Sequence, residues 1–381
     1  MNISNVEENN KLYRSLSEDK KIISVGYSHI VLNERKKGTV VAFGENENGE
    51  CDINDWKDIS YVFAGDGYTL GVKFDGTICV AGNSEIKNFE GIRVKKVFPG
   101  SSSLIAIRQD GEILYSKQCD EMIPPSIKEF LSTANIKQII YARFFSMNNM
   151  FVNAPVYVLL ENGRVYPIKG TVMEVEAWRD IVQVIIHDNV DGGNTVFGLK
   201  KDGTVLAAGN LDEEEKVVSE WKDIIGILDG SICVFGLKKD GTVVCTGKEA
   251  KYVSEWTNIV QIAGGGLTAA GLKNDGTVLF SEDYPASSSW CTGDEIANCN
   301  DIIALDYGPN NIVAISANGK IYCCGQNIYE QCNCNGTVIF NDIKSVVTYQ
   351  RQRDGRCVYC GGRFKGLFVK KCSECGEKKN Y

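Results

Sequence analysis

Short apolar runs on either side of an Asp-Gly or Asn-Gly pair recur along the chain. At residues 195–209, "TVFGLK" and "TVLAAG" flank the pair Asp202-Gly203, and polar residues bracket each apolar run. A two-residue turn between antiparallel strands needs positive φ, which Gly tolerates freely and which Asp and Asn tolerate better than most residues. The pattern therefore predicts a β-hairpin at each occurrence.

The hairpin pattern occurs eight times, and in seven of the eight an Asp or Asn precedes the turn glycine. A further apolar run precedes each hairpin, as in "DIVQVII" at 180–186, and a landmark such as "WRDI" at 178–181 opens several units. Each unit is thus predicted to hold three short strands, or four with its linker, and no helix. The turn glycines are Gly38, Gly76, Gly111, Gly163, Gly203, Gly241, Gly276 and Gly319.

Repetition at this period predicts how the units pack. A sheet of three short strands cannot bury both faces by itself, whereas copies arranged around an axis cover one another and protect their edges. We therefore predict an all-β fold, a β-propeller of small antiparallel blades over residues 21–347. A linear solenoid is the alternative, but its repeats are usually shorter and lack a hairpin in every unit.

The repeated phrase also resembles a known family. The form G-L-K-x-D-G-T-V, as at 198–205 and 236–243, is similar to the repeat of the regulator of chromosome condensation superfamily, which includes a bacterial propeller that inhibits β-lactamase. The resemblance covers about residues 20–342 and implies seven blades, whereas eight hairpins are present, so seven and eight both remain open. The third and fourth units are degenerate, and Pro167 predicts an edge or irregular strand in the fourth. No nucleotide-exchange residues are carried over from the family.

The C-terminal end shows a second pattern outside the repeats. Cys357, Cys360, Cys372 and Cys375 form two C-x-x-C pairs, each followed by Gly, with eleven residues between the pairs. This spacing resembles that of zinc ribbons and predicts one structural Zn²⁺ held by four thiolates. The alternative is four free thiols. We accordingly divide the chain into a polar N-terminal segment (1–20), the propeller (21–347) and a zinc ribbon (352–381).

Charge differs between these parts. The chain carries a net charge of −8, yet residues 351–381 hold nine Lys and Arg against three Asp and Glu, a balance of +6, which leaves −14 for residues 1–350. An acidic body disfavours broad nucleic-acid binding by the propeller. Nucleic-acid contact is conceivable through the ribbon, at Arg363, Lys365, Lys370 and Lys371, but a structural or partner-docking role is the simpler expectation.

Catalytic chemistry finds little support in the sequence. The two histidines, His29 and His187, are too few for a His-based catalytic metal site, and neither a phosphate-binding loop nor a nucleophile elbow is present. The cysteine-rich stretch 323–336 is expected to pack in a strand and a loop, because the adjacent Cys323 and Cys324 point to opposite faces of a strand; a second metal site is the alternative. No catalytic or cofactor-binding residue is assigned beyond the four zinc ligands.

These observations predict a non-enzymatic scaffold or regulatory protein that binds a protein partner through its blade loops. No apolar run approaches the roughly 20 residues of a membrane span, and the N-terminus lacks the features of a signal peptide, so we expect a cytoplasmic monomer with no membrane contact. The alternatives are an enzyme with a site at the central channel and a nucleic-acid-associated regulator that acts through the basic ribbon.

Overall fold

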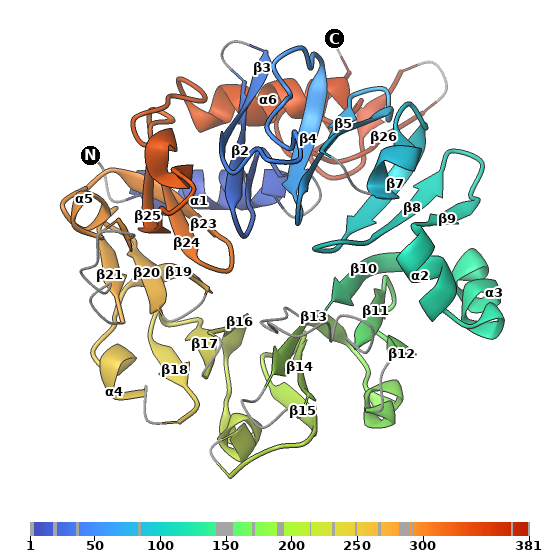
Figure 1. The fold of residues 1–381 in the computed structure, drawn as a ribbon. Helices are drawn as coiled ribbons and strands as arrows, with labels where there is room; N and C mark the ends of the chain where they lie inside the picture. The colour runs from blue at the N-terminus through green and yellow to red at the C-terminus, as the bar shows by residue number, and fades with distance from the viewer. Residues whose placement is uncertain are drawn as a thin grey trace.

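Eight small antiparallel sheets follow one another along the chain in the computed structural model (Figure 1). The structure describes residues 4–17, 21–35, 38–82, 85–141, 155–169, 172–188, 194–213, 215–230, 233–247, 250–265, 268–281, 290–291, 293–366 and 369–379. In each sheet the three main strands pair in chain order, and the eighth sheet gains a fourth, outer strand.

The strands of the first four sheets are β1 (Ile23–Val25), β2 (His29–Glu34) and β3 (Thr39–Gly44); β4 (Ile59–Ala64), β5 (Tyr68–Lys73) and β6 (Ile78–Gly82); β7 (Val94–Pro99), β8 (Leu104–Arg108) and β9 (Ile113–Tyr115); and β10 (Ile136–Tyr141), β11 (Val156–Leu160) and β12 (Val165–Lys169). The strands of the other four are β13 (Ile181–Asp188), β14 (Asn194–Lys200) and β15 (Val205–Gly209); β16 (Ile224–Asp229), β17 (Val234–Lys238) and β18 (Val243–Cys245); β19 (Ile259–Gly265), β20 (Thr268–Lys273) and β21 (Val278–Phe280); and β22 (Trp290–Cys291), β23 (Ile302–Tyr307), β24 (Asn311–Ser316) and β25 (Ile321–Gln326).

The hydrophobic core is divided among the junctions between neighbouring sheets. Each of the eight junctions contains one cluster of buried apolar side chains. One of the eight clusters lies between the last and the first sheet, where Ile30 and Leu32 pack with Val313 and Ile315. The ring is therefore closed, and the predicted β-propeller is confirmed with eight blades. The first strand of each blade lies nearest the centre (Figure 1).

The hairpin turn of one blade contacts the W-x-D-I landmark that opens the next blade. The carbonyl of the turn residue Gly203 accepts a hydrogen bond from the Ile224 amide, 3.0 Å away, at the start of the next blade. The residue before Ile224, Asp223, has a positive φ of 59°, and its carbonyl accepts from the Lys239 amide of its own blade at 2.8 Å. The amides of Val94, Ile181, Ile259 and Ile302 make the same bond to the turn glycine of the preceding blade. The third, fifth, sixth, seventh and eighth blades thus begin on the hairpin turn of the blade before, which explains why the turn and the landmark that opens the next unit repeat together.

The two degenerate units are complete blades. Both form three paired strands, and Pro167 lies in β12, the outermost strand of the fourth blade. An edge strand tolerates proline because one side of its backbone has no partner strand to receive an N–H. The prediction for Pro167 is confirmed, and neither unit is an insertion.

The expectation that the units contain no helix is wrong. After its third strand the chain must return across the outer edge of the ring, and several linkers do so as helical turns whose apolar side chains enter a blade junction, as Cys119 and Leu131 do. These elements are η1 (Glu85–Phe89), α2 (Lys117–Met122), α3 (Pro125–Thr133), η3 (Met173–Ala177), η4 (Glu215–Glu220), α4 (Ala250–Val253), α5 (Asp294–Ala297) and η5 (Gln331–Cys334).

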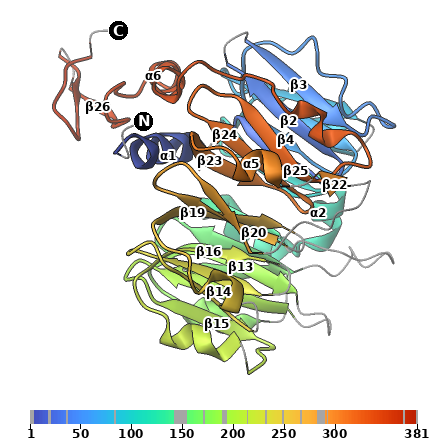
Figure 2. The same ribbon diagram turned by 90° about the vertical axis from the view of Figure 1, so that its left-hand side faces the viewer.

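Two longer helices lie on one face of the ring. Helix α1 (Ser4–Ser17) and helix α6 (Ile343–Arg353) pack together there, next to the C-terminal hairpin of β26 (Phe364–Lys365) and β27 (Lys371–Cys372) (Figure 2). Helix α1 arises from the polar N-terminal segment, yet Val6, Tyr13 and Leu16 are buried. Among the described residues, no helix is long and apolar enough to cross a bilayer.

Candidate metal centre

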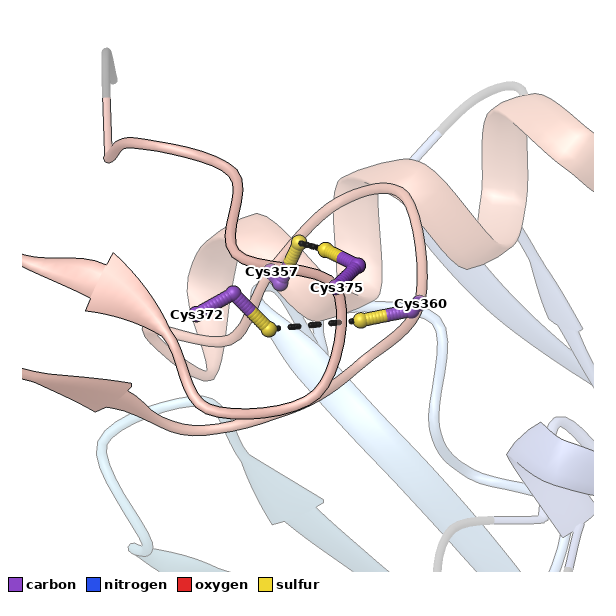
Figure 3. A group of neighbouring side chains, drawn as sticks. All are labelled: Cys357, Cys360, Cys372 and Cys375. Carbon is purple, nitrogen blue, oxygen red and sulfur yellow. Dashed lines mark hydrogen bonds between the residues drawn. The ribbon is translucent and has the colours of Figure 1, made fainter.

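The four cysteines of the predicted ribbon come together in the structure. Their sulfur atoms all lie within 4.8 Å of one another, and Figure 3 shows them converging from two loops. The Sγ atoms of Cys357 and Cys375 are 3.6 Å apart, and those of Cys360 and Cys372 are 3.3 Å apart. Cys357 and Cys372 are buried, whereas Cys360 and Cys375 are exposed. This small module has one shielded side and one open side.

The local chain geometry follows from the C-x-x-C-G pattern. The amide of Gly361 donates to the Cys357 carbonyl at 2.7 Å, and the amide of Gly376 donates to the Cys372 carbonyl at 3.1 Å. Both glycines have positive φ, 79° and 76°, so each pair closes a tight turn that other residues would strain. A short antiparallel pair of strands lies between the turns: Phe364 pairs with Cys372, and Lys365 pairs with Lys371.

Backbone amides favour the thiolate form at one ligand position. Hydrogen bonding from the backbone N–H of Cys375, with a further contribution from that of Glu374, lowers the pKa of Cys372 to about 6. The Glu374 nitrogen lies 3.4 Å from the Cys372 sulfur. Because metals bind the thiolate and not the thiol, these amides prepare the position for a metal ion.

The arrangement of sulfurs fits a tetrahedral ion. Four thiolates at about 2.3 Å from a central Zn²⁺ would have sulfurs about 3.8 Å apart, close to the separations observed. Disulfide sulfurs lie about 2.05 Å apart, so neither close pair is a disulfide. The four cysteines therefore lie close enough together to hold one metal ion. In such a site the protein fills every coordination position, which is the arrangement of structural and not catalytic centres.

Arg351 ties the first cysteine turn to helix α6. Its Nη1 donates to the carbonyls of Val358 and Tyr359, at 3.2 and 2.9 Å, and both carbonyls lie between Cys357 and Cys360. The Arg351 carbonyl in turn accepts from the Arg356 amide at 2.8 Å. The sequence analysis did not identify Arg351, because nothing in the spacing of the cysteines points to it.

Helix α6 is in turn attached to the first two blades. The buried side chain of Gln350 accepts from Arg35 Nη2 at 3.0 Å and donates to Ser60 Oγ at 3.3 Å. The Arg353 guanidinium lies 4.5 Å from the centre of the Phe74 ring, which belongs to the hairpin turn of the second blade. The four-cysteine module is therefore joined to the ring by a packed helix and not by a loose linker.

The other cysteine-rich stretch behaves as predicted for a packed strand and loop. Cys323 belongs to the core cluster between the eighth and first blades, and Cys324 to the cluster between the seventh and eighth, so the two side chains point to opposite faces. Cys332 and Cys334 are also buried in the first of these clusters. Within the described ranges, only the C-terminal set brings three or more metal-binding side chains close enough to share an ion.

Both histidines lie on strands. His29 on β2 is buried, with Nε2 2.9 Å from Thr69 Oγ1 of the second blade. His187 on β13 has Nδ1 2.7 Å from Asp229 Oδ1 of the next blade and Nε2 4.0 Å from Glu215 Oε1. Sequence reasoning missed this buried group, because its members lie 14 to 42 residues apart and only the ring brings them together. Its position between the fifth and sixth blades makes it a link between blades.

The four basic residues of the ribbon, Arg363, Lys365, Lys370 and Lys371, are all exposed. They lie on the two short strands of the C-terminal hairpin or close to them, and their charged groups face solvent.

Comparison with known proteins returns structures and no sequence family. No family model matches the chain, and no curated protein matches it either. Solved structures that are similar include the CRINKLY WD40 ectodomain of the Arabidopsis thaliana receptor kinase ACR4, at 15% identity over 80% of this chain and 94% of that chain, with a TM-score of 0.40. The computationally designed protein Ika8 matches at 12% identity over 80% and 95%, with a TM-score of 0.43. Prp20p of Saccharomyces cerevisiae matches at 13% identity over 84% and 75%, with a TM-score of 0.33.

Proposed function

We propose that the chain is a non-enzymatic scaffold that binds a protein partner, built on a propeller of the chromosome-condensation-regulator kind and carrying one structural zinc ion in its C-terminal ribbon. In this proposal the protein is a cytoplasmic monomer. The observation that carries it is the attachment of a closed four-cysteine centre to the ring through Arg351, Gln350 and Arg353. A metal centre with no free coordination position, held firmly on one face of a disc, extends a binding surface and performs no chemistry itself.

Quantitative affinity purification from the cell that makes the protein tests this function. The tagged full chain is compared with a Cys357→Ser/Cys360→Ser variant and with an unrelated propeller under the same tag. We expect one or a few proteins in near-stoichiometric amount with the full chain and absent from the unrelated propeller. Recovery of no protein above the control level, under mild cross-linking as well, would contradict a scaffold role.

A second candidate function has one specific observation in its favour. Because Arg363, Lys365, Lys370 and Lys371 are exposed and residues 351–381 have a charge balance of +6, the ribbon can approach nucleic-acid phosphates. Changing all four to Ser should then weaken binding to single- and double-stranded oligonucleotides and reduce its salt dependence. If the unchanged protein shows no salt-dependent binding either, this candidate is eliminated.

A further inference from the structure

The first strand of seven blades contains the same irregularity. Each has a β-bulge near its start, where one residue has no partner in the second strand. The skipped residues, in blade order from the second to the eighth, are Ser60, Lys95, Lys137, Val182, Ile225, Val260 and Ile303. All occupy the same position in their blades, on the face of the ring that carries α1 and α6.

The chain's own helices cover this position at two blades. Ile303 is fully buried, and its carbonyl accepts a hydrogen bond from Asn10 of α1 at 2.9 Å. Ser60 is buried under α6, where its hydroxyl meets Gln350. Helix α1 packs there through Tyr13 and Leu16, which are three residues apart and so share one face of the helix. At these two blades, a helix of the chain itself therefore packs on this ring position.

The same position is open at four consecutive blades. Val182 and Ile225 expose 39% and 48% of their surface, and Lys95 and Lys137 are exposed beside them. Hydrogen bonds link the third, fourth and fifth blades at this position: Lys96 Nζ donates to the Lys137 carbonyl at 2.7 Å, and Lys137 Nζ donates to the Val182 carbonyl at 2.9 Å. We call Lys95, Lys137, Val182 and Ile225 the bulge arc. Half of it is apolar and half is cationic.

We propose that the bulge arc docks an amphipathic helix of the partner protein, with aliphatic side chains against Val182 and Ile225 and carboxylates against Lys95 and Lys137. The inference deepens the proposed scaffold function and depends on it. Two observations select this occupant: the arc begins beside the second blade, where α6 covers the same ring position at Ser60, and its charge calls for acidic residues at one end of the helix.

Site-specific photo-cross-linking in the cell that makes the protein tests the position. A photoreactive phenylalanine derivative replaces Val182 or Ile225, and, as the matched control, Val217, which is 37% exposed on η4. We expect an adduct with one protein from the two arc positions but not from Val217, and mass spectrometry should place the linked residue in an amphipathic segment rich in Asp and Glu. An adduct with a second copy of this chain, or with nucleic acid, would overturn the proposal.

Binding of the linked segment, as a synthetic peptide, to the full chain then tests the chemistry. Val182→Asp and Ile225→Asp should each raise the dissociation constant by about tenfold or more. Lys95→Glu/Lys137→Glu should also raise it and reduce its salt dependence, whereas Val217→Asp should leave it unchanged. Thermal unfolding confirms that each variant remains folded. If a partner cross-links or co-purifies but binds the arc variants as well as the parent, the bulge arc is wrong and the scaffold function survives; if no partner is found at any position, the scaffold function itself fails.

Discussion

Gly198 lies so close to the indole of Trp178 that a β-carbon at Gly198 would stand 2.6 Å from Trp178 Cζ3. The same relationship recurs between Trp56 and Gly71, Trp221 and Gly236, and Trp256 and Gly271, with separations of 2.6, 2.8 and 2.7 Å. The indole therefore packs against the middle strand of its own blade, and the glycine of the repeated "GLK" or "GVK" phrase makes room for it. In these blades the tryptophan and the glycine form one structural unit.

Gly198→Ala should consequently destabilise the protein. The added methyl group meets a ring that is held in a packed core, and overpacking of this kind costs about 1–3 kcal/mol. The free energy of unfolding, measured by urea denaturation followed by circular dichroism, reports the loss. We expect a lower midpoint with an unchanged slope.

Gly226 provides the matched control. It lies on a first strand, no atom beyond its chain neighbours comes within 4 Å of a β-carbon built there, and its φ is not positive. Gly226→Ala should leave stability unchanged or raise it by a few tenths of a kcal/mol. Equal destabilisation by both substitutions would mean that the indole is not what excludes a side chain at Gly198.

His29 should make stability depend on pH. The Thr69 hydroxyl donates to the Glu50 carbonyl at 2.6 Å, so it accepts from His29, and the proton of the neutral ring lies on Nε2. Further protonation would have to occur at Nδ1, which is buried and has no hydrogen-bond partner among the described residues. Burial accordingly lowers the pKa of His29 to about 4, from an ordinary value near 6.5.

The sign follows from proton binding. Between pH 6.5 and pH 4 the unfolded chain binds a proton at His29 that the folded chain does not, so this contribution is complete above pH 6.5 and is lost as the pH falls toward 4. The loss amounts to about 3 kcal/mol over that interval. The free energy of unfolding of the parent, relative to that of His29→Gln, should fall as the pH is lowered from 7.5 to 4.5. Parallel curves would contradict the assignment.

Local patterns made the blades and the cysteine centre predictable, whereas contacts between distant segments did not. The Asp202-Gly203 turn and the Cys357/Cys360 pair each follow from residues a few positions apart, where turn chemistry and ligand spacing act directly. By contrast, Gln350 meets Ser60 and Asn10 meets Ile303 across nearly the whole chain. Nothing within the polar segment 4–17 shows that Tyr13 will be buried. Its burial depends on the position of β23, a strand of the eighth blade that lies far away in the sequence.

The metal centre should hold one ion per chain. Native mass spectrometry and elemental analysis of the full chain should give a stoichiometry of one, with zinc as the metal. Cys357→Ser/Cys375→Ser should abolish binding while the thermal transition of the propeller remains, because the four ligands come only from the C-terminal module. Cys299→Ser, at a half-exposed cysteine of a blade linker, is the control and should keep the metal. If the protein is red and contains iron, the metal is not zinc but the four-cysteine site stands. A full chain that binds no metal would contradict the site.

Arg351 should control how tightly the ion is held. Its guanidinium fixes the carbonyls of Val358 and Tyr359, and loss of a group that orients ligands typically weakens metal affinity by about 10–100-fold. Competition with a chromophoric chelator should show this loss for Arg351→Ala and little change for Lys370→Ala, whose side chain is exposed.

Gln350→Ala separates orientation from attachment, because the Gln350 side chain bonds to Arg35 and Ser60 of the ring, whereas Arg351 bonds to the first cysteine turn. This variant should keep the affinity for the ion and yet increase hydrogen exchange along α6. If Arg351→Ala and Gln350→Ala instead weaken metal binding equally, the ion depends on the docking of the whole helix onto the first two blades, and the arginine has no special role.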